Sequence, residues 1–567
     1  MADRQGEPPR LSDLLWLLLV LVVLVATGIG TRAPWPADEP RFALIARDMV
    51  ASGDWLIPRV GGNVYQEKPP FFFWLLSSFY ALTGSLRVAF LLPSLIAAGT
   101  VLGLVYDLAR RLAGREAALA AAGTLAFTVQ FVMTTRSAQI DATLCALTTL
   151  SLYGLLRHLL LGPAWWWYFA GGVAAGLGVI TKGVGFLPLL VLIPYGVFRA
   201  RGFEGLPRFP GGVRWAGVAV GFLLGVSVWL VPMLTRVANS ADPELKAYRN
   251  GILFQQTVER YAAAWHHVKP WYYFLVEVIP PLWLPFSLLL FWLVPKWRQA
   301  WRAKDARVWL PLAWVLLAVL FFSLSSGKRG IYLFPALPGA MLAAAPFLPE
   351  LFKRVGVRRA SLVLGAALVV PALVLAVGAL IHAVPMQRVG LDSPTPLIVF
   401  AVAASALWLV AWRRRQILAW PAVLACLAVV WSYGITPLID SERSGRGFTE
   451  SVMAQVPASK ELAFVGYKEQ FFLYADRPTV NFGHRRWVEG PQEGYDAATW
   501  INAAPGRVAL IEANAAKECF SRSPQRIAGK TSGDTWLLVE APADSACAAR
   551  GDAQRAHRYD PPRRSPT

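Results

Sequence analysis

Residues 360–381 read ASLVLGAALVVPALVLAVGALI, an apolar run that contains no charged residue. A second run, LLWLLLVLVVLVATGI, occupies residues 14–29. Apolar stretches of about 18 or more residues can cross the roughly 30 Å hydrocarbon core of a bilayer as a helix. Because such stretches recur along most of the chain, the sequence predicts an integral membrane protein with many transmembrane helices.

The composition agrees with this prediction. Hydrophobic residues make up 56% of the chain and charged residues 16%, whereas soluble domains contain about 25% charged residues. The 24 Trp and 16 Tyr residues suit the aromatic belts at the two membrane surfaces. Hydropathy predicts about thirteen spans, at residues 11–30, 86–109, 117–135, 138–160, 165–181, 184–200, 214–235, 271–295, 308–325, 331–349, 360–382, 394–412 and 417–437.

The formal net charge of +20 has two explanations. In a soluble protein it would indicate nucleic-acid binding, but the sequence lacks the basic, aromatic-lined pattern typical of such a site. In a membrane protein, basic residues gather in the cytoplasmic loops. We therefore expect no nucleic-acid partner, and we assign the charge to loops that face anionic lipid.

The apolar segment 69–84 decides the orientation of the chain, because it is short for a membrane crossing. If it does not cross, Arg4 and Arg10 share one side of the membrane with five basic clusters. These clusters are Arg110/Arg111/Arg115, Arg199/Arg201/Arg208, Lys296/Arg298/Arg302/Lys304/Arg307, Lys353/Arg354/Arg358/Arg359 and Arg413/Arg414/Arg415. The positive-inside rule makes that side cytoplasmic. Loops 31–85 and 236–270 and the tail from residue 438 are then predicted to lie outside the cytoplasm.

The tail differs in composition from the membrane part. The runs ELAFVGY, RVALIEA and TWLLVEA, separated by polar and Gly/Pro stretches, are typical of strands. We divide the chain into a transmembrane domain, residues 1–437, and a small extracytoplasmic α/β domain, residues 438–567. The basic end PPRRSPT is expected to be disordered. Cys519 and Cys547 either form a disulfide outside the cytoplasm or stay reduced, and the sequence leaves both open.

The first outer loop carries a helical pattern beside acidic residues. Residues 39–50 place their apolar side chains on one face, with Arg47 and Asp48 elsewhere, which predicts a helix lying on the membrane surface. Asp38 and Glu39 stand at its start. A carboxylate there either caps the helix or belongs to a site.

Other ionisable residues gather near the same membrane face. A carboxylate at that depth is costly unless it is paired or functional, so Asp141 is an ion-pair partner of Arg136, a helix cap at the membrane interface, or a site residue. The basic pair Lys328 and Arg329 lies between two spans on the outer side, where the positive-inside rule does not favour it, and this suggests a bound phosphate. The remaining residues of this set are Glu67, Lys68, Glu259, Arg260, His266, His267 and Tyr332.

Five motifs carry a resemblance to a known family. They are D-E-x-R-[YF]-x-x-I-A-R-[DE]-M-x-x-S-G-D-W at Asp38–Trp55, E-K-P-P at Glu67–Pro70, R-S-x-x-x-D at Arg136–Asp141, E-R-[YF]…H-x-x-P-W-Y-Y at Glu259–Tyr273 and K-R-x-x-Y-x-x-P-x-x-P at Lys328–Pro338. In order and spacing the chain resembles the GT-C glycosyltransferases of the bacterial aminoarabinose transferase and protein O-mannosyltransferase superfamily. Its length and outer tail look most like the lipid A aminoarabinose transferases.

The resemblance implies a fold and an activity. The fold is the polytopic helical GT-C fold with about thirteen transmembrane helices, juxtamembrane helices and a small C-terminal domain. The activity is transfer of a sugar, with 4-amino-4-deoxy-L-arabinose as the leading candidate, from undecaprenyl phosphate to lipid A. It takes place on the periplasmic face of the bacterial inner membrane, and in the family it modifies lipopolysaccharide and gives polymyxin resistance.

The resemblance also implies residue roles. The catalytic acids would be Asp38, Asp141 and Glu39, and the donor phosphate would be bound by Lys68, Lys328, Arg329, Tyr332 and Arg260. Glu67 and His267 match positions that hold zinc in a family member. Two protein ligands are few for zinc, which usually has four in structural sites, so a metal stays open.

Three alternatives remain at this point. The acceptor is a protein or another glycan rather than lipid A; a hydroxyl acceptor needs a general base, whereas an ionised lipid A phosphate does not. The chain is a lipid or sugar transporter, which would place ionisable residues near the bilayer midplane. Lys182 comes closest to that, although a lysine near the end of a span can extend to the surface. Lastly, the membrane part only presents the tail, and the acids have no function.

Overall fold

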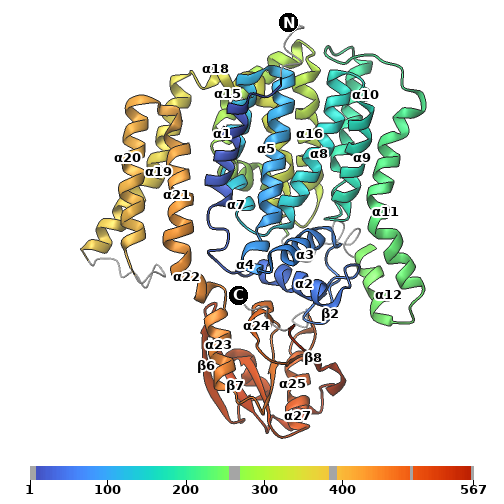
Figure 1. The fold of residues 1–567 in the computed structure, drawn as a ribbon, viewed down its shortest axis with the longest axis vertical. Coiled ribbons are helices and arrows are strands. Elements are labelled where there is room, and N and C mark those ends of the chain that lie inside the picture. The colour runs from blue at the N-terminus through green and yellow to red at the C-terminus, as the bar shows by residue number, and fades with distance from the viewer. Residues whose placement is uncertain (1–7, 254–267, 382–392, 485–488, 563–567) are drawn as a thin grey trace. The chain divides into compact units, whose positions relative to one another are not determined.

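A computed structural model describes residues 8–253, 268–381, 393–484 and 489–562 (Figure 1). It divides into two compact units. The first, which we call the helical unit, contains residues 1–29, 67–72 and 91–435. The second, the loop–tail unit, contains residues 30–66, 73–90 and 436–567. The domain boundary at residue 437 stays a prediction.

Eight helical segments of the described chain are long and apolar enough to cross a membrane, or ten if each of two bent pairs is one span. The eight are Leu86–Ala113, Ile140–Leu161, Gly212–Ala238, Ala306–Leu324, Gly330–Leu351, Val355–Leu380, Thr395–Arg414 and Gln416–Gln455. The bent pairs are Arg115–Ala126 with Val129–Thr135, at 63°, and Phe274–Leu282 with Phe286–Arg302, at 112°.

The predicted number of thirteen spans is not confirmed. The three other predicted spans correspond to shorter helices: Leu11–Ala26, Trp165–Val179 and Leu187–Ala200. Segment 69–84 forms the helix α3 (Phe71–Thr83), whose 13 residues are also short of the about 20 needed to cross.

The helices of the helical unit have the following bounds. They are α1 (Leu11–Leu21), η2 (Val22–Ala26), α5 (Leu92–Ala113), α6 (Arg115–Ala126), α7 (Val129–Thr135), α8 (Ile140–Leu161), α9 (Trp165–Val179), η3 (Leu187–Val191), α10 (Leu192–Ala200), η4 (Gly212–Ala216), α11 (Gly217–Ala238), α12 (Pro243–Asn250), η6 (Phe274–Val278), α14 (Ile279–Leu282), α15 (Phe286–Arg302), α16 (Ala306–Leu324), η7 (Gly330–Ala336), α17 (Leu337–Ala344), η8 (Ala345–Phe347), α18 (Leu348–Leu351), α19 (Val355–Leu380), α20 (Thr395–Arg414), η10 (Gln416–Leu418), α21 (Ala419–Val430) and η11 (Trp431–Ile435).

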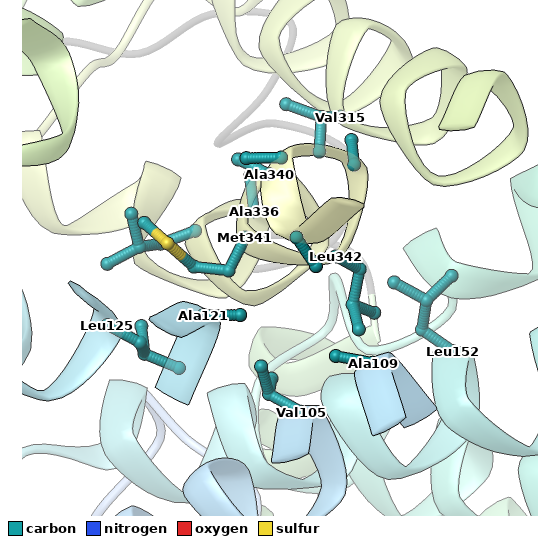
Figure 2. Packing of buried hydrophobic residues seen from close by; sticks show 14 of the residues in the cluster. Val105, Ala109, Ala121, Leu125, Leu152, Val315, Ala336, Ala340, Met341 and Leu342 are labelled. Carbon is teal, nitrogen blue, oxygen red and sulfur yellow. The ribbon is translucent and has the colours of Figure 1, made fainter. Parts of the chain in front are cut away.

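Small residues let these helices pack closely. Figure 2 shows Ala109 of α5, Ala121 of α6, Ala340 of α17 and Ala336, which precedes α17, among larger apolar side chains. At Gly172 of α9 an added Cβ would lie 2.1 Å from a backbone oxygen of α11. Close approach at small residues is how helices gain packing energy in lipid, where no hydrophobic force drives them together.

Several predicted basic loops meet at one end of the helical unit. Lys304 donates to the Arg201 carbonyl oxygen at 3.2 Å, so the loop before α16 contacts the end of α10. Glu350 accepts from Lys296 at 2.8 Å and from Arg354 at 3.1 Å, which joins the end of α15 to the start of α19. These contacts agree with the prediction that three of the clusters, in segments 199–208, 296–307 and 353–359, share one side of the membrane.

The loop–tail unit combines helices with a six-stranded sheet. Its elements are α2 (Glu39–Ser52), β1 (Arg59–Val60), β2 (Asn63–Val64), α3, α4 (Leu86–Ala89), α22 (Thr436–Arg443), α23 (Arg446–Gln455), β3 (Glu461–Phe464), α24 (Glu469–Tyr474), β4 (Thr479–Asn481), α25 (Gln492–Asn502), β5 (Arg507–Glu512), α26 (Ala513–Cys519), β6 (Gln525–Thr531), β7 (Asp534–Glu540), α27 (Ser545–Ala548), η13 (Ala553–Arg555) and β8 (His557–Tyr559). The three predicted strand runs are β3, β5 and β7. The predicted α/β character of the tail is therefore confirmed.

The sheet has the strand order β6-β7-β5-β3-β4-β8. β3 pairs in parallel with β4 and β5, while the outer pairs are antiparallel. Alternate residues such as Ala463, Val465 and Ile511 are buried in the core under α25 and α26. Of the predicted disordered end, residues 563–567 lie outside the described residues.

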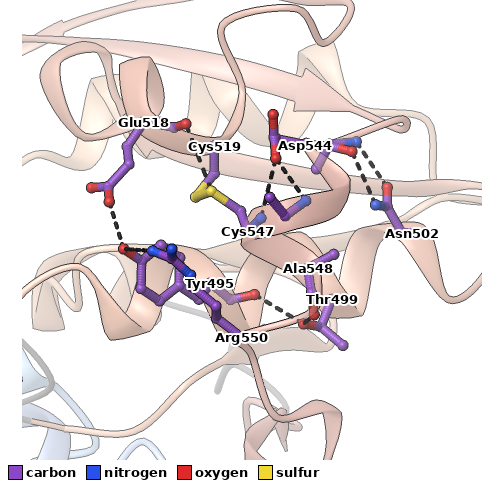
Figure 3. Close-up of a disulfide and its surroundings, with 11 residues drawn as sticks. Tyr495, Thr499, Asn502, Glu518, Cys519, Asp544, Cys547, Ala548 and Arg550 are labelled. Carbon is purple, nitrogen blue, oxygen red and sulfur yellow. Dashed lines mark hydrogen bonds between the residues drawn. A yellow bond between two sulfur atoms is a disulfide. The ribbon is translucent and has the colours of Figure 1, made fainter.

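Cys519 and Cys547 form a disulfide with a Cα–Cα distance of 5.6 Å (Figure 3). Asp544 caps the short helix α27 that carries Cys547, accepting from its backbone N–H at 3.1 Å. The bond joins α26 to α27. Of the two possibilities that the sequence left open, the structure has the paired one.

Helix α2 packs through its polar side as well as through its apolar side. Its apolar residues are buried as expected, but Arg47 is also buried, at 7% exposure. The Arg47 guanidinium donates to the carbonyl oxygens of Phe472 and Leu473 and to the Tyr559 hydroxyl, at 2.8–2.9 Å. Asp48 accepts from the Tyr559 hydroxyl at 2.7 Å. Arg47 and Asp48, which lie off the apolar face, are therefore covered by α24 and β8 of the tail.

Candidate functional site

Asp38 occupies the N-cap position of α2 without capping it. Its backbone precedes the first helical residue, yet its side chain makes no capping hydrogen bond. The carboxylate faces Arg41, one turn on, with an N–O distance of 3.6 Å and 24% side-chain exposure. The ordinary structural explanation for an acid at this position is thus not the one realised here.

The neighbouring Glu39 is held by several donors. Both terminal nitrogens of Arg32 donate to its carboxylate, one of them at 2.8 Å. The backbone N–H of Trp35 donates to it at 2.8 Å. Its side chain is only 6% exposed. Glu39 therefore closes the turn of residues 32–39 onto the start of α2, and its acceptor sites are largely used within the protein.

Arg41 links α2 to the tail. Its Nε donates to Glu469 at 2.5 Å, and Nε2 of His484 lies 3.4 Å from the same carboxylate oxygen. Burial alone would raise the pKa of Glu469, but the hydrogen bond from His484 and the charge of Arg41 bring it down to about 2. Arg41 is therefore fixed beside Asp38 by a carboxylate that stays ionised at neutral pH.

A second group of charges lies in the helical unit. Asp141, in the first turn of α8, accepts from Lys182 Nζ at 2.7 Å. The same ammonium lies 4.6 Å from the ring centroid of Tyr332. A buried carboxylate at a helix N-terminus is stabilised both by this cation and by the helix dipole. Arg136, the expected alternative partner, donates to the Leu24 carbonyl oxygen and to Ser432.

The predicted basic pair before η7 divides into two environments. Lys328 is 4% exposed, and its ammonium donates to the backbone oxygens of Lys269, at 2.9 Å, and Ser325. Burial lowers the pKa of Lys328. Arg329, next in the chain, is exposed. The backbone oxygen of Gly330 accepts from Gln130 at 2.9 Å, which fixes the turn that carries Arg329 and Tyr332.

The remaining predicted residues are only partly described. The Lys68 ammonium donates to the Glu67 carbonyl oxygen at 3.0 Å, and Phe71 N–H donates to the carbonyl oxygen of Ile180 at 3.3 Å. The E-K-P-P segment thus lies beside the turn that carries Lys182. Glu259, Arg260, His266 and His267 lie outside the described residues.

A metal has limited support from the part of the chain that the structure describes. Within it, no group of three or more His, Cys, Asp or Glu side chains is arranged to hold an ion. Of the predicted ligand pair only Glu67 is described, so whether His267 joins it is not tested. The zinc site stays a prediction.

Sequence reasoning did not identify Lys182, Arg32 or Glu469 as members of these groups. Lys182 was taken to extend toward the membrane surface, whereas it turns to Asp141 and Tyr332. The sequence did offer one signal, because Lys182 is a charged residue within the otherwise uncharged stretch between Gly178 and Gly183. Arg32 and Glu469 are known only from the fold, because their partners lie in other segments.

Comparison with known proteins supports the resemblance drawn from the motifs. Residues 67–231 match the family of dolichyl-phosphate-mannose-protein mannosyltransferases. Two undecaprenyl phosphate-alpha-4-amino-4-deoxy-L-arabinose arabinosyl transferases, from Pseudomonas fluorescens and Aeromonas hydrophila, are each 31% identical over 58% of this chain. The matched segments cover 58% and 59% of those relatives.

A solved structure is similar along almost the whole chain. The crystal structure of ArnT from Cupriavidus metallidurans bound to undecaprenyl phosphate matches with a TM-score of 0.70 and 20% identity. The match covers 93% of this chain and 97% of that one. The predicted GT-C fold and the predicted resemblance are therefore confirmed, and the chain is a multi-pass membrane protein.

Proposed function

We propose that this chain, which is similar to GT-C glycosyltransferases in sequence and fold, transfers a sugar from undecaprenyl phosphate. We further propose that the sugar is 4-amino-4-deoxy-L-arabinose and the acceptor lipid A. The observation that carries the proposal is the likeness to aminoarabinose transferases, in sequence over 58% of the chain and in fold over 93%. The charged groups described above supply chemistry that suits this reaction.

The leaving group of such a reaction is a lipid phosphate. Cations near it stabilise the negative charge that develops as the sugar departs. Arg329 is exposed and can bind phosphate through two parallel N–H groups. Lys328 uses its ammonium on two backbone oxygens, so we assign it to shaping the loop that presents Arg329. Lys68 and Arg260 remain proposed phosphate ligands.

The two acids have different proposed tasks. Asp38 is partly exposed and loosely paired, so it can meet an incoming group. With an ionised lipid A phosphate as acceptor no general base is needed, and Asp38 would hold the amine of the sugar or orient the acceptor. Asp141, bonded to Lys182, would set the position of that ammonium and of the Tyr332 ring. Glu39 would position the turn that carries Asp38.

Two observations support a site on the periplasmic face of the inner membrane. The basic loops meet at one end of the helical unit, and such an end faces the cytoplasm under the positive-inside rule. The tail contains the Cys519–Cys547 disulfide, and disulfides persist in oxidising compartments such as the periplasm.

A second candidate keeps the donor class and changes the acceptor. The family matched by residues 67–231 is described as a protein mannosyltransferase. A Ser or Thr hydroxyl would then be the acceptor, and Asp38 would act as its general base. A transporter remains the candidate of another class; it predicts no chemical change in either lipid.

The test is mass spectrometry of lipid A from a host without its own aminoarabinose transferase. Expression of this chain should add the mass of aminoarabinose to lipid A. The Asp38→Asn variant should abolish the addition, whereas Asp476→Asn, an equal change at an exposed tail residue, should leave it intact. Absence of the addition, with folded protein and donor lipid present, would remove lipid A as the acceptor.

The donor class is tested separately with purified protein. Incubation with a sugar-linked undecaprenyl phosphate and candidate acceptors should release free undecaprenyl phosphate. Release with a peptide or glycan acceptor alone would favour the second candidate. No release with any acceptor, together with movement of lipid across a vesicle membrane, would favour the transporter.

A further inference from the structure

An apolar groove lies within the helical unit, away from the charged groups of the candidate site. It runs between α1, α6, α15, α19 and α21 and has a volume of about 280 Å³. Trp16, Leu119, Leu289, Leu364 and Ile417 are among its lining residues. In Figure 1 α19, α20 and α21 stand together beside α1, so the groove follows the junction between this group and the other helices.

The hydroxyl groups of the groove are already bonded. Thr124 donates to the Ala120 carbonyl oxygen at 2.8 Å, and Ser361 donates to the Ile417 carbonyl oxygen at 2.9 Å. Trp420 donates through its indole N–H to the Phe127 carbonyl oxygen at 2.8 Å. A cavity of this kind does not hold water well, because water needs two or more polar partners. Its lining suits a hydrocarbon chain.

One end of the groove is strongly basic. Its lining residues Phe352 and Val357 flank Lys353 and Arg354, and Ile417 follows Arg413, Arg414 and Arg415 in the chain. Arg358 and Arg359, three and two residues before the lining residue Ser361, are exposed. The segments 350–364 and 409–421 contain one acid, Glu350, which already accepts from Lys296 and Arg354.

Arg358 connects the charge to the groove. Its Nε donates to the carbonyl oxygen of Phe352, at 3.3 Å, and Phe352 lines the groove. The guanidinium is thereby placed at the groove end. Among the described residues its terminal nitrogens have no hydrogen-bond partner, so they can bind an anion as a pair.

We propose that this groove binds an anionic glycerophospholipid, with one acyl chain between α1 and α19–α21 and its phosphate on Arg358 and Arg359. The apolar groove suits the acyl chain of such a lipid, and the basic residues at its end suit the phosphate. Basic pockets between transmembrane helices bind anionic head groups in this way. The lipid fills space that helix packing leaves open, and it links α19–α21 to the other helices. A polyprenyl chain and a zwitterionic lipid are the alternatives that the test must exclude.

Native mass spectrometry of the full chain in detergent measures this binding. After detergent washing and titration with phosphatidylglycerol, one lipid should stay bound in preference to phosphatidylethanolamine. Arg358→Gln/Arg359→Gln should lower phosphatidylglycerol occupancy about tenfold or more at equal lipid concentration. Arg201→Gln/Arg214→Gln removes the same charge from exposed sites elsewhere in the helical unit and should not change occupancy.

A photoactivatable phosphatidylglycerol shows where its acyl chain lies in the protein. A diazirine near the end of one acyl chain should label lining residues away from the arginines, such as Thr124, Phe127 or Leu364, and Ala360→Phe should suppress the label by filling the groove. If Ala360→Phe does not fold, the double arginine variant still tests the site, because both side chains are exposed. Equal retention of phosphatidylethanolamine, equal loss in the control variant, or competition for the label by undecaprenyl phosphate but not by phosphatidylglycerol would overturn the proposal.

Discussion

Glu39 of the loop–tail unit and Asp141 of the helical unit, two of the predicted catalytic acids, are buried with different partners. In the loop–tail unit, Glu39 accepts from Arg32 and Trp35, and Glu469 from Arg41 and His484. In the helical unit, Asp141 is held by Lys182, whose ammonium also faces an aromatic ring. We expect acids that accept from several fixed donors, such as Glu39, to be structural. We expect an acid with a single cationic partner, such as Asp141, or with a loose contact, such as Asp38, to keep the capacity to respond to a substrate.

The largest expected effect is a fall in the rate of sugar transfer when Asp38, the loosely paired acid, is replaced. Asp38→Asn should lower the rate of sugar transfer by a factor on the order of 10²–10⁴, the range for losing an acid–base or orienting group. The melting temperature should stay close to that of the wild type, since Asp38 makes no capping bond. Rates are measured by release of undecaprenyl phosphate and stability by thermal unfolding in detergent. A large fall in melting temperature would make Asp38 structural.

The reverse pattern, a clear loss of stability, is expected at the neighbouring Glu39, whose carboxylate accepts from Arg32 and Trp35. Glu39→Ala leaves Arg32 buried without its carboxylate partner, and breaking a buried ion pair costs about 3 kcal/mol or more. The loop–tail unit should unfold earlier, as followed by proteolysis of loop 31–66. Asp476→Asn serves as the control at an exposed site. If Glu39→Ala abolishes transfer with unchanged unfolding, the division between structural and functional acids fails.

Two acids of the loop–tail unit predict opposite pH dependence. Burial raises the pKa of Asp48 to about 6, so the folded state favours the protonated form. Stability from this group is present below about pH 4 and is lost as the pH rises through 6, by about 3 kcal/mol. The lowered pKa of Glu469, about 2, gives stability that is present above about pH 4.5 and is lost as the pH falls toward 2.

Variants separate the two contributions. Asp48→Asn should flatten the fall in stability between about pH 4 and 6, and Glu469→Gln should remove the rise with pH below about pH 4.5. Unfolding by denaturant at a series of pH values measures both. The same slope in wild type and Asp48→Asn would mean that Asp48 does not titrate in this range.

The smallest expected effect concerns the bond between α2 and β8. Tyr559→Phe removes a hydroxyl that accepts from Arg47 and donates to Asp48, at a cost of about 1–2 kcal/mol. Thermal unfolding should shift downward while sugar transfer at low temperature is unchanged. Loss of transfer in a folded Tyr559→Phe variant would give this contact a role in the site.

The sequence was most informative where a pattern is local. Long apolar runs predicted most of the span-length helices, and three short runs predicted β3, β5 and β7. Three predicted spans correspond to helices shorter than a full crossing, and hydropathy does not register where such a helix ends. Within the helical unit, for example, η2 ends at Ala26, before the predicted end of the first span at residue 30.

Contacts between distant segments were beyond such reasoning. The Asp141–Lys182 pair joins residues 41 apart, and the Arg41–Glu469 pair joins residues 428 apart. Nothing in the composition of either segment specifies its partner. The partners of Arg47 and Asp48 could not be predicted for the same reason, since α24 and β8 lie far along the chain from α2.

The bond from Arg47 to Tyr559 has a consequence for biosynthesis, because it spans 512 residues of chain. At a translation rate of about 5–20 residues per second, roughly 25–100 seconds separate the synthesis of the two residues. During that interval the first loop has left the ribosome while the last strand does not yet exist. The first loop can therefore reach its final packing only after Tyr559 has been made. A stop codon a few residues before Tyr559 would leave Arg47 of α2, near the start of the protein, without this contact.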